Sequence, residues 1–156
     1  MGIFIDNSYP WWETILIIKE RSFTMNTMVF VNFPVANVEK STEFYEKLGF
    51  KQNKEFSNDD ASAMVWDDHF WIMLLNHEFY QKFLSGKTIA DVQKTSGALI
   101  AFSLESAQAV KDFGEIAKAN GGNYHHVEMG IPEEQMYGLE VQDPDGNTLE
   151  PSWMAV

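Results

Sequence analysis

The chain has 156 residues, and 45% of them are hydrophobic, which suits one globular domain with a single substantial core. Its formal net charge of −12 argues against a surface for nucleic acids or anionic membranes, since such surfaces need a surplus of Lys and Arg. The absence of cysteine excludes disulfides, thiolate nucleophiles and zinc-thiolate sites, and a cytoplasmic location is therefore expected.

The first 27 residues differ in character from the rest of the chain, and we expect them to be an N-terminal extension upstream of one domain spanning residues 28–156. The apolar run from Ile15 to Ile18 is too short to span a bilayer. The run has no basic region before it and no small-residue cleavage site after it, so the sequence does not predict a signal peptide. The Pro10-Trp11-Trp12 segment could dock on the domain or on a partner.

Residues 28–75 predict a β-α-β-β-β unit. A β-branched, apolar strand over 29–35 is followed by Asn37, a suitable N-cap, and by a helix that Gly49 would end. Three further strands are predicted over 50–57, 61–66 and 69–75.

A polar, helix-prone connection over 76–96 leads into a second unit over 97–154. A strand over 97–104 precedes a helix that Ser106 would cap and Gly121-Gly122 would stop. Strands over 123–128, 136–142 and 147–153 would complete this unit.

The two units repeat each other at one constant offset. Phe30 falls on Leu99, Asn37 on Ser106 and Phe44 on Phe113, so strand matches strand and helix matches helix in the same order. An internal repeat of this length predicts two copies of one supersecondary module.

The stretch from Gln142 to Glu150 combines a tight turn, Asp143-Pro144-Asp145-Gly146, with a strand that carries a lone carboxylate. It resembles the closing hairpin of the vicinal oxygen chelate superfamily, which includes glyoxalase I, extradiol dioxygenases, fosfomycin-resistance enzymes and bleomycin-binding proteins. The resemblance implies an α+β fold in which the two modules form a curved, cup-shaped eight-stranded sheet with helices on the convex face.

Members of that superfamily that use metal take one ligand from the first and one from the last strand of each module. The matching positions here are Phe30, Met73, Leu99 and Glu150, of which only Glu150 offers a donor suited to a hard or borderline cation. We therefore expect no metal, no other cofactor, and neither glyoxalase nor dioxygenase activity.

The histidines do not obviously replace the missing ligands. His125 and His126 are adjacent, so on a strand they would point to opposite faces. A cation held by His69 or His126 with an acidic partner remains an open alternative.

Strand alternation predicts which side chains face the helices and which face the cup. The helix-facing residues should be Val29, Val31, Phe33, Val35, Phe70, Ile72, Leu74, Ile100, Phe102 and Leu104. The cup should be lined by Phe30, Asn32, Trp71, Met73, Leu99, Ala101, Ser103, Glu150 and Ser152, with Met64 or Trp66 beside them and Tyr137 at the rim.

Such a lining predicts a metal-independent protein that binds a small aromatic or partly apolar molecule, and the resemblance implies a homodimer. A desolvated Glu150 could instead serve as general acid or base in an enzyme, of the lactoylglutathione-lyase-like or isomerase type, with or without a divalent cation. A third possibility is a regulatory or interaction protein whose cup is filled by its own side chains.

Overall fold

The computed structural model describes residues 27–155. The expected N-terminal extension, including the Pro10-Trp11-Trp12 segment, lies outside the described residues apart from Thr27. Within residues 27–155, no helix combines the length and the apolar character needed to cross a membrane.

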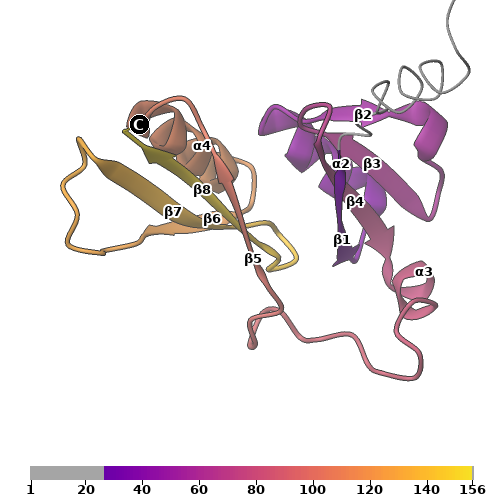
Figure 1. The fold of residues 1–156 in the computed structure, drawn as a ribbon. Helices are drawn as coiled ribbons and strands as arrows, with labels where there is room; N and C mark the ends of the chain where they lie inside the picture. The colour runs from indigo at the N-terminus through magenta and orange to yellow at the C-terminus, as the bar shows by residue number, and fades with distance from the viewer. Residues whose placement is uncertain (1–26, 156) are drawn as a thin grey trace, which may run out of the picture.

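The described chain forms the two predicted modules, joined by a connection that begins with a short helix (Figure 1). The first module contains β1 (Val29–Val35), α2 (Val38–Lys47), β2 (Lys51–Asn53), the 3₁₀ turn η1 (Lys54–Phe56), β3 (Ala61–Val65) and β4 (Phe70–Asn76). The connection starts with α3 (His77–Gln81). The second module contains β5 (Leu99–Ser103), α4 (Ala107–Ala119), β6 (Asn123–His126), β7 (Met136–Gln142) and β8 (Thr148–Met154).

The helices α2 and α4 begin at the predicted caps. The Asn37 side chain accepts a hydrogen bond of 2.9 Å from the Lys40 amide, and the Ser106 side chain accepts one of 3.0 Å from the Ala109 amide. These bonds satisfy amides that the first turn of a helix leaves without a backbone partner. The repeat therefore extends to the way each helix starts.

The strand predicted over 50–57 is shorter than expected. It ends at Asn53, whose side chain accepts a hydrogen bond of 3.0 Å from the Glu55 amide. Short side-chain to backbone bonds of this kind compete with strand pairing, so the chain turns into η1.

Each module forms a four-stranded sheet with the same topology. The strand orders are β1-β4-β3-β2 and β5-β8-β7-β6, and in each sheet the first strand pairs in parallel with the last. The predicted α+β fold with twin β-α-β-β-β modules is confirmed, and its eight strands are hydrogen-bonded as two sheets of four.

One core is shared by both modules. The faces predicted to meet the helices are largely confirmed, because Phe33, Val35, Ile72 and Leu74 are buried in the core. Ile100 and Phe102 of β5 are partly buried and pack against this core. Val29 is an exception, since it lies at the start of β1 and is 51% exposed.

The expectation that Met64 or Trp66 lines the cup is wrong. Met64 pairs in register with Ile72, shares its face and is fully buried in the core. The Trp66 ring lies 5.5 Å from Phe102 and 6.3 Å from Phe113, measured between ring centroids. Trp66 therefore joins the two modules through aromatic packing.

The turn between β7 and β8 is a second junction between the modules. Gly146 adopts φ +97°, as the predicted turn requires, and Asp143 accepts bonds of 2.9 Å from the amides of both Asp145 and Asn147. The Asp145 carboxylate then accepts a bond of 2.8 Å from the Ala36 amide, just before α2. This turn thus ties the second module to the end of β1.

Candidate functional site

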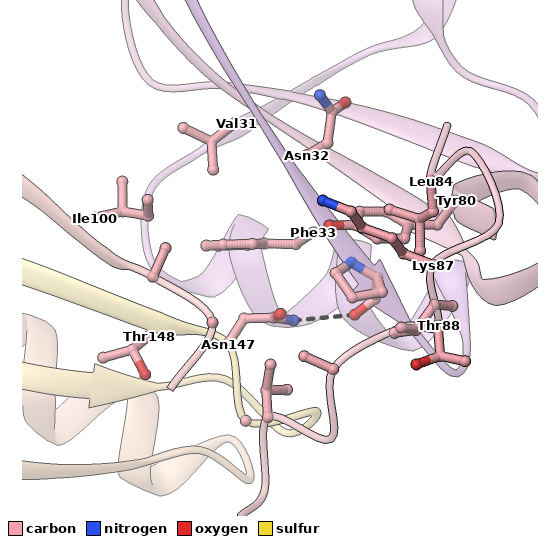
Figure 2. Close-up of a pocket in the computed structure, with 17 residues that line it drawn as sticks. Val31, Asn32, Phe33, Tyr80, Leu84, Lys87, Thr88, Ile100, Asn147 and Thr148 are labelled. Atoms are coloured by element: carbon pink, nitrogen blue, oxygen red, sulfur yellow. Dashed lines mark hydrogen bonds between the residues drawn. The ribbon is translucent and has the colours of Figure 1, made fainter. Parts of the chain in front are cut away.

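A cavity of about 510 Å³ lies where β1, the connection and the start of β5 come together (Figure 2). Its lining comprises Val31, Asn32, Phe33, Pro34, Tyr80, Leu84, Lys87, Thr88, Ile89, Ala90, Val92, Gly97, Ala98, Ile100, Gly146, Asn147 and Thr148. The cavity is therefore built from both modules and from the segment that joins them.

Most of the wall is apolar. β1 supplies Val31 and Phe33, β5 supplies Ile100, and the connection supplies Leu84 and Ile89. Figure 2 shows Ile100 on the opposite side of the cavity from Leu84. Such a wall favours a ligand that buries apolar surface.

A few polar groups interrupt this wall. The side-chain amide of Asn147 already has partners, because its nitrogen donates to the Pro34 carbonyl at 3.1 Å and to the Asp143 carboxylate at 2.9 Å. The side chains of Asn32, Tyr80 and Thr88 make no hydrogen bond with another described residue, so they can meet a ligand.

The connection reaches the cavity through a tight turn after α3. Ser85 and Gly86 both have positive φ, +49° and +88°, and the Lys87 amide donates to the Leu84 carbonyl at 3.0 Å. The Gln81 side chain also donates to the Lys87 carbonyl, at 2.6 Å. Further on, the Gln93 side chain donates to the Pro144 carbonyl at 3.4 Å and holds the connection against the turn between β7 and β8.

The site residues predicted from the sequence do not line a single cavity. Asn32 alone among them lines the cavity of about 510 Å³. Phe30 and Trp71 meet edge to face, 5.5 Å apart between ring centroids, and the Trp71 indole donates to the Asp67 carbonyl at 3.1 Å. Met73 belongs to the same face of the first sheet, because it follows Trp71 by two positions along β4.

Three other predicted residues lie on the second sheet. Leu99 and Ser103 are exposed on β5, and Glu150 is partly buried and pairs in register with Ala101. Leu99 and Ser103 line separate, shallower hollows, one between the connection and β6, the other beside Phe70.

Tyr137 faces the other side of the second sheet. Its ring stacks on His126 at 4.5 Å between centroids, and the Lys111 ammonium of α4 lies 5.0 Å from the ring centroid. Alternation along β7 explains this position, since Tyr137 shares its face with the buried Leu139.

Sequence reasoning overlooked Glu140, which pairs in register with His125 across β6 and β7. Burial raises the pKa of Glu140, the Glu150 carboxylate raises it further, and His125 opposes the shift. Glu140 and His125 line a hollow of about 400 Å³ together with Leu99. The alternation within residues 136–142 would have placed Glu140 on the same face as Glu150, so a signal was available.

The chemistry of these residues does not fit a bound divalent cation. Phe30 and Leu99 have no donor atom, and the Met73 thioether is a soft ligand. Among residues 27–155, no three His, Asp or Glu side chains lie close enough together to hold a metal ion. His126 does have an acidic neighbour, Glu128, at 3.1 Å, but this pair is exposed and lacks a third ligand.

Several solved structures have a fold similar to that of this chain. A hypothetical protein, SA1046 from S. aureus, has a TM-score of 0.65 and 22% identity, covering 83% of this chain and 94% of that one. A glyoxalase/bleomycin resistance protein/dioxygenase family enzyme from Burkholderia phytofirmans PsJN has a TM-score of 0.64 and 16% identity, covering 83% and 99%. A bleomycin resistance determinant encoded on the transposon Tn5 has a TM-score of 0.55 and 17% identity, covering 83% and 98%.

No curated protein matches the chain. The profile of the Glyoxalase/Bleomycin resistance protein/Dioxygenase superfamily matches residues 27–150, which include both modules and the connection. The chain belongs to the glyoxalase/bleomycin resistance protein/dioxygenase superfamily.

Proposed function

We propose that this chain is a cytoplasmic, metal-independent protein that binds a small, aromatic or partly apolar molecule. The observation that carries the proposal is the cavity between the modules, with its apolar wall and few polar groups. Its volume of about 510 Å³ falls within the range of roughly 300–1,000 Å³ that is typical of small-molecule sites.

The position of the cavity supports the proposal as well. Its wall combines β1, the connection and β5, so a bound molecule would contact both modules and the segment between them. Burying apolar surface contributes about 25 cal/mol per Å², so these walls would favour a ligand with apolar surface of its own.

The test is to fill the cavity. Ala98→Trp adds a large ring to its wall, whereas Ala119→Trp adds the same ring at the exposed end of α4, away from the cavity. Thermal shift and calorimetry with a panel of aromatic and medium-chain aliphatic compounds should show binding to the parent chain and to Ala119→Trp. Binding to Ala98→Trp should be lost, with circular dichroism confirming that the variant is folded.

Two results would overturn the proposal. One is that no compound of the panel binds, and the other is that Ala98→Trp binds as the parent does. If binding survives in Ala98→Trp but is lost in Trp71→Ala, the ligand instead occupies the cup residues Phe30, Trp71 and Met73. Dialysis against a chelator should leave binding unchanged, because no metal is required.

A second candidate function is an enzyme of lyase or isomerase type that uses Glu150 as acid or base. The specific observation in its favour is the row of His125, Glu140 and Glu150 on one face of the second sheet, with the pKa of Glu140 raised by burial. Turnover of a bound compound that disappears in Glu150→Gln, while the affinity for that compound persists, would favour the enzyme over the binding protein.

We also propose a homodimer. Large apolar side chains are exposed on strands of both sheets: Val29 is 51% exposed, Phe30 50% and Leu99 54%. Exposed apolar side chains on strands often mark an interface between subunits. Light scattering should give the mass of two chains, and Phe30→Asp should shift it toward one.

A further inference from the structure

We propose that the ligand of the cavity carries a carboxylate, and that the Lys87 ammonium binds it. This inference rests on the proposed function, because it names the class of molecule that the same cavity would take. A small apolar monocarboxylic acid matches both the walls and the charge of the site.

The charge of Lys87 stands out against its surroundings. The chain carries a net charge of −12, yet Lys87 is the only charged residue among those that line the cavity. Its ammonium forms no ion pair with any described residue, whereas Lys94 nearby is paired with Asp91 at 3.0 Å. A positive charge beside an apolar cavity, with no acid beside it, favours an anionic ligand.

The backbone around Lys87 is held in a specific conformation. Ser85 has φ +49°, a left-handed conformation that is uncommon outside glycine, and it is the only non-glycine residue with positive φ among residues 27–155. Bonds to Leu84 and from Gln81 fix the Lys87 backbone on both sides. In Figure 2 the Lys87 side chain runs from the connection toward β1.

The neighbouring donors fit a carboxylate better than a phosphate. The lining contains one lysine and no arginine, and its other hydrogen-bonding side chains, which include Tyr80 and Asn32, are neutral. Phosphate carries more charge and is usually bound by several cationic or backbone donors together. One ammonium with neutral donors balances a single negative charge.

The test compares two probes with the same carbon skeleton, the anionic phenylbutyrate and the neutral phenylbutyramide. The parent chain should bind the acid about tenfold more tightly than the amide, since hydrogen bonds to charged groups contribute about 1.5 kcal/mol or more. Lys87→Met should reduce the affinity for the acid to that for the amide and leave the amide unaffected. Lys82→Met is the matched control, because Lys82 lies over the Phe79 ring, 5.5 Å from its centroid, and does not line the cavity.

The outcomes separate this inference from the proposed function. Equal binding of acid and amide, or a preference for the acid that survives Lys87→Met, would overturn the carboxylate while the binding function stands. Loss of the preference in Lys82→Met as well would also overturn it, because any surface lysine would then suffice. If neither probe binds at millimolar concentration, the inference fails together with the function on which it rests.

Discussion

The hydroxyl of Tyr45 in α2 donates a hydrogen bond of 2.9 Å to the carboxylate of Asp143, and both residues are buried. This bond crosses from one module to the other. Burial raises the pKa of Tyr45 well above its ordinary value, and Asp143 raises it further, so the hydroxyl keeps its proton and remains a donor.

We predict that Tyr45→Phe lowers the free energy of unfolding by about 1–2 kcal/mol, because a buried carboxylate loses one of its donors. Urea denaturation followed by circular dichroism measures this change. Tyr80→Phe is the control, since the Tyr80 hydroxyl has no partner among the described residues. Equal stability of the two variants would contradict the prediction.

The Asp145 carboxylate should stabilise the junction at the start of α2. It accepts bonds from the Ala36 amide at 2.8 Å and from the Ser41 hydroxyl at 3.3 Å, and it lies near the helix N-terminus, where a negative charge is favourable. We expect Asp145→Ala to destabilise the chain by about 1 kcal/mol. The exposed Asp68 provides a control, because Asp68→Ala removes the same charge away from this junction.

Gly122 has no room for a side chain. A Cβ atom there would clash with the Gln142 carbonyl oxygen and lie 3.0 Å from ring atoms of Phe44. We predict that Gly122→Ala costs about 2 kcal/mol of stability, measured by thermal unfolding.

The matched substitution is Gly138→Ala, whose Cβ would meet nothing closer than Ser152 at 3.7 Å. This change should alter stability by less than about 1 kcal/mol. If both glycine substitutions proved equally harmless, the close approach of Gly122 to β7 would be disproved.

The pKa of Glu140 should respond to its two neighbours in opposite directions. Glu150→Gln removes the negative charge that raises this pKa and should lower it, whereas His125→Gln removes the group that lowers it and should raise it. NMR titration of the Glu140 carboxyl carbon measures both shifts. Glu133→Gln, at a residue that bonds Lys111 instead, should leave the titration unchanged.

The same shift predicts how stability depends on pH. Folding raises the pKa of Glu140 above its ordinary value of 4.5. The contribution of Glu140 to stability is therefore fully present below pH 4.5 and is lost as the pH rises through the pKa of Glu140 in the folded state. Glu150→Gln should therefore gain more stability, relative to the parent chain, at neutral pH than at acidic pH. An equal change at both pH values would contradict this assignment.

Most of the fold could be predicted from the sequence because the relevant signals are local or periodic. Asn37 and Ser106 cap their helices as expected, and the alternation around Ile72 and Leu74 identifies the core face. The internal repeat then predicts that the two sheets have the same strand order, since the pattern of each half supports the interpretation of the other.

The candidate site was predicted much less well. Only Asn32 of the predicted residues lines the cavity between the modules, and a large part of the wall of this cavity depends on the path of the connection. That path is set by contacts such as the bond from Gln93 to the Pro144 carbonyl, which join distant segments and leave no periodic pattern in the sequence. Glu140 could have been found, because strand alternation places it on the face opposite the apolar Leu139 and Val141, the face assigned to Glu150.

The connection that begins with α3 is at once the covalent tether of the two sheets and a wall of the cavity. Insertions or deletions in this segment would therefore resize this chamber while every strand ladder stayed intact. A circular permutant opened there would keep both sheets, yet its chamber would lose its continuous outer wall. The size of the chamber and the integrity of the scaffold can thus change separately in this chain.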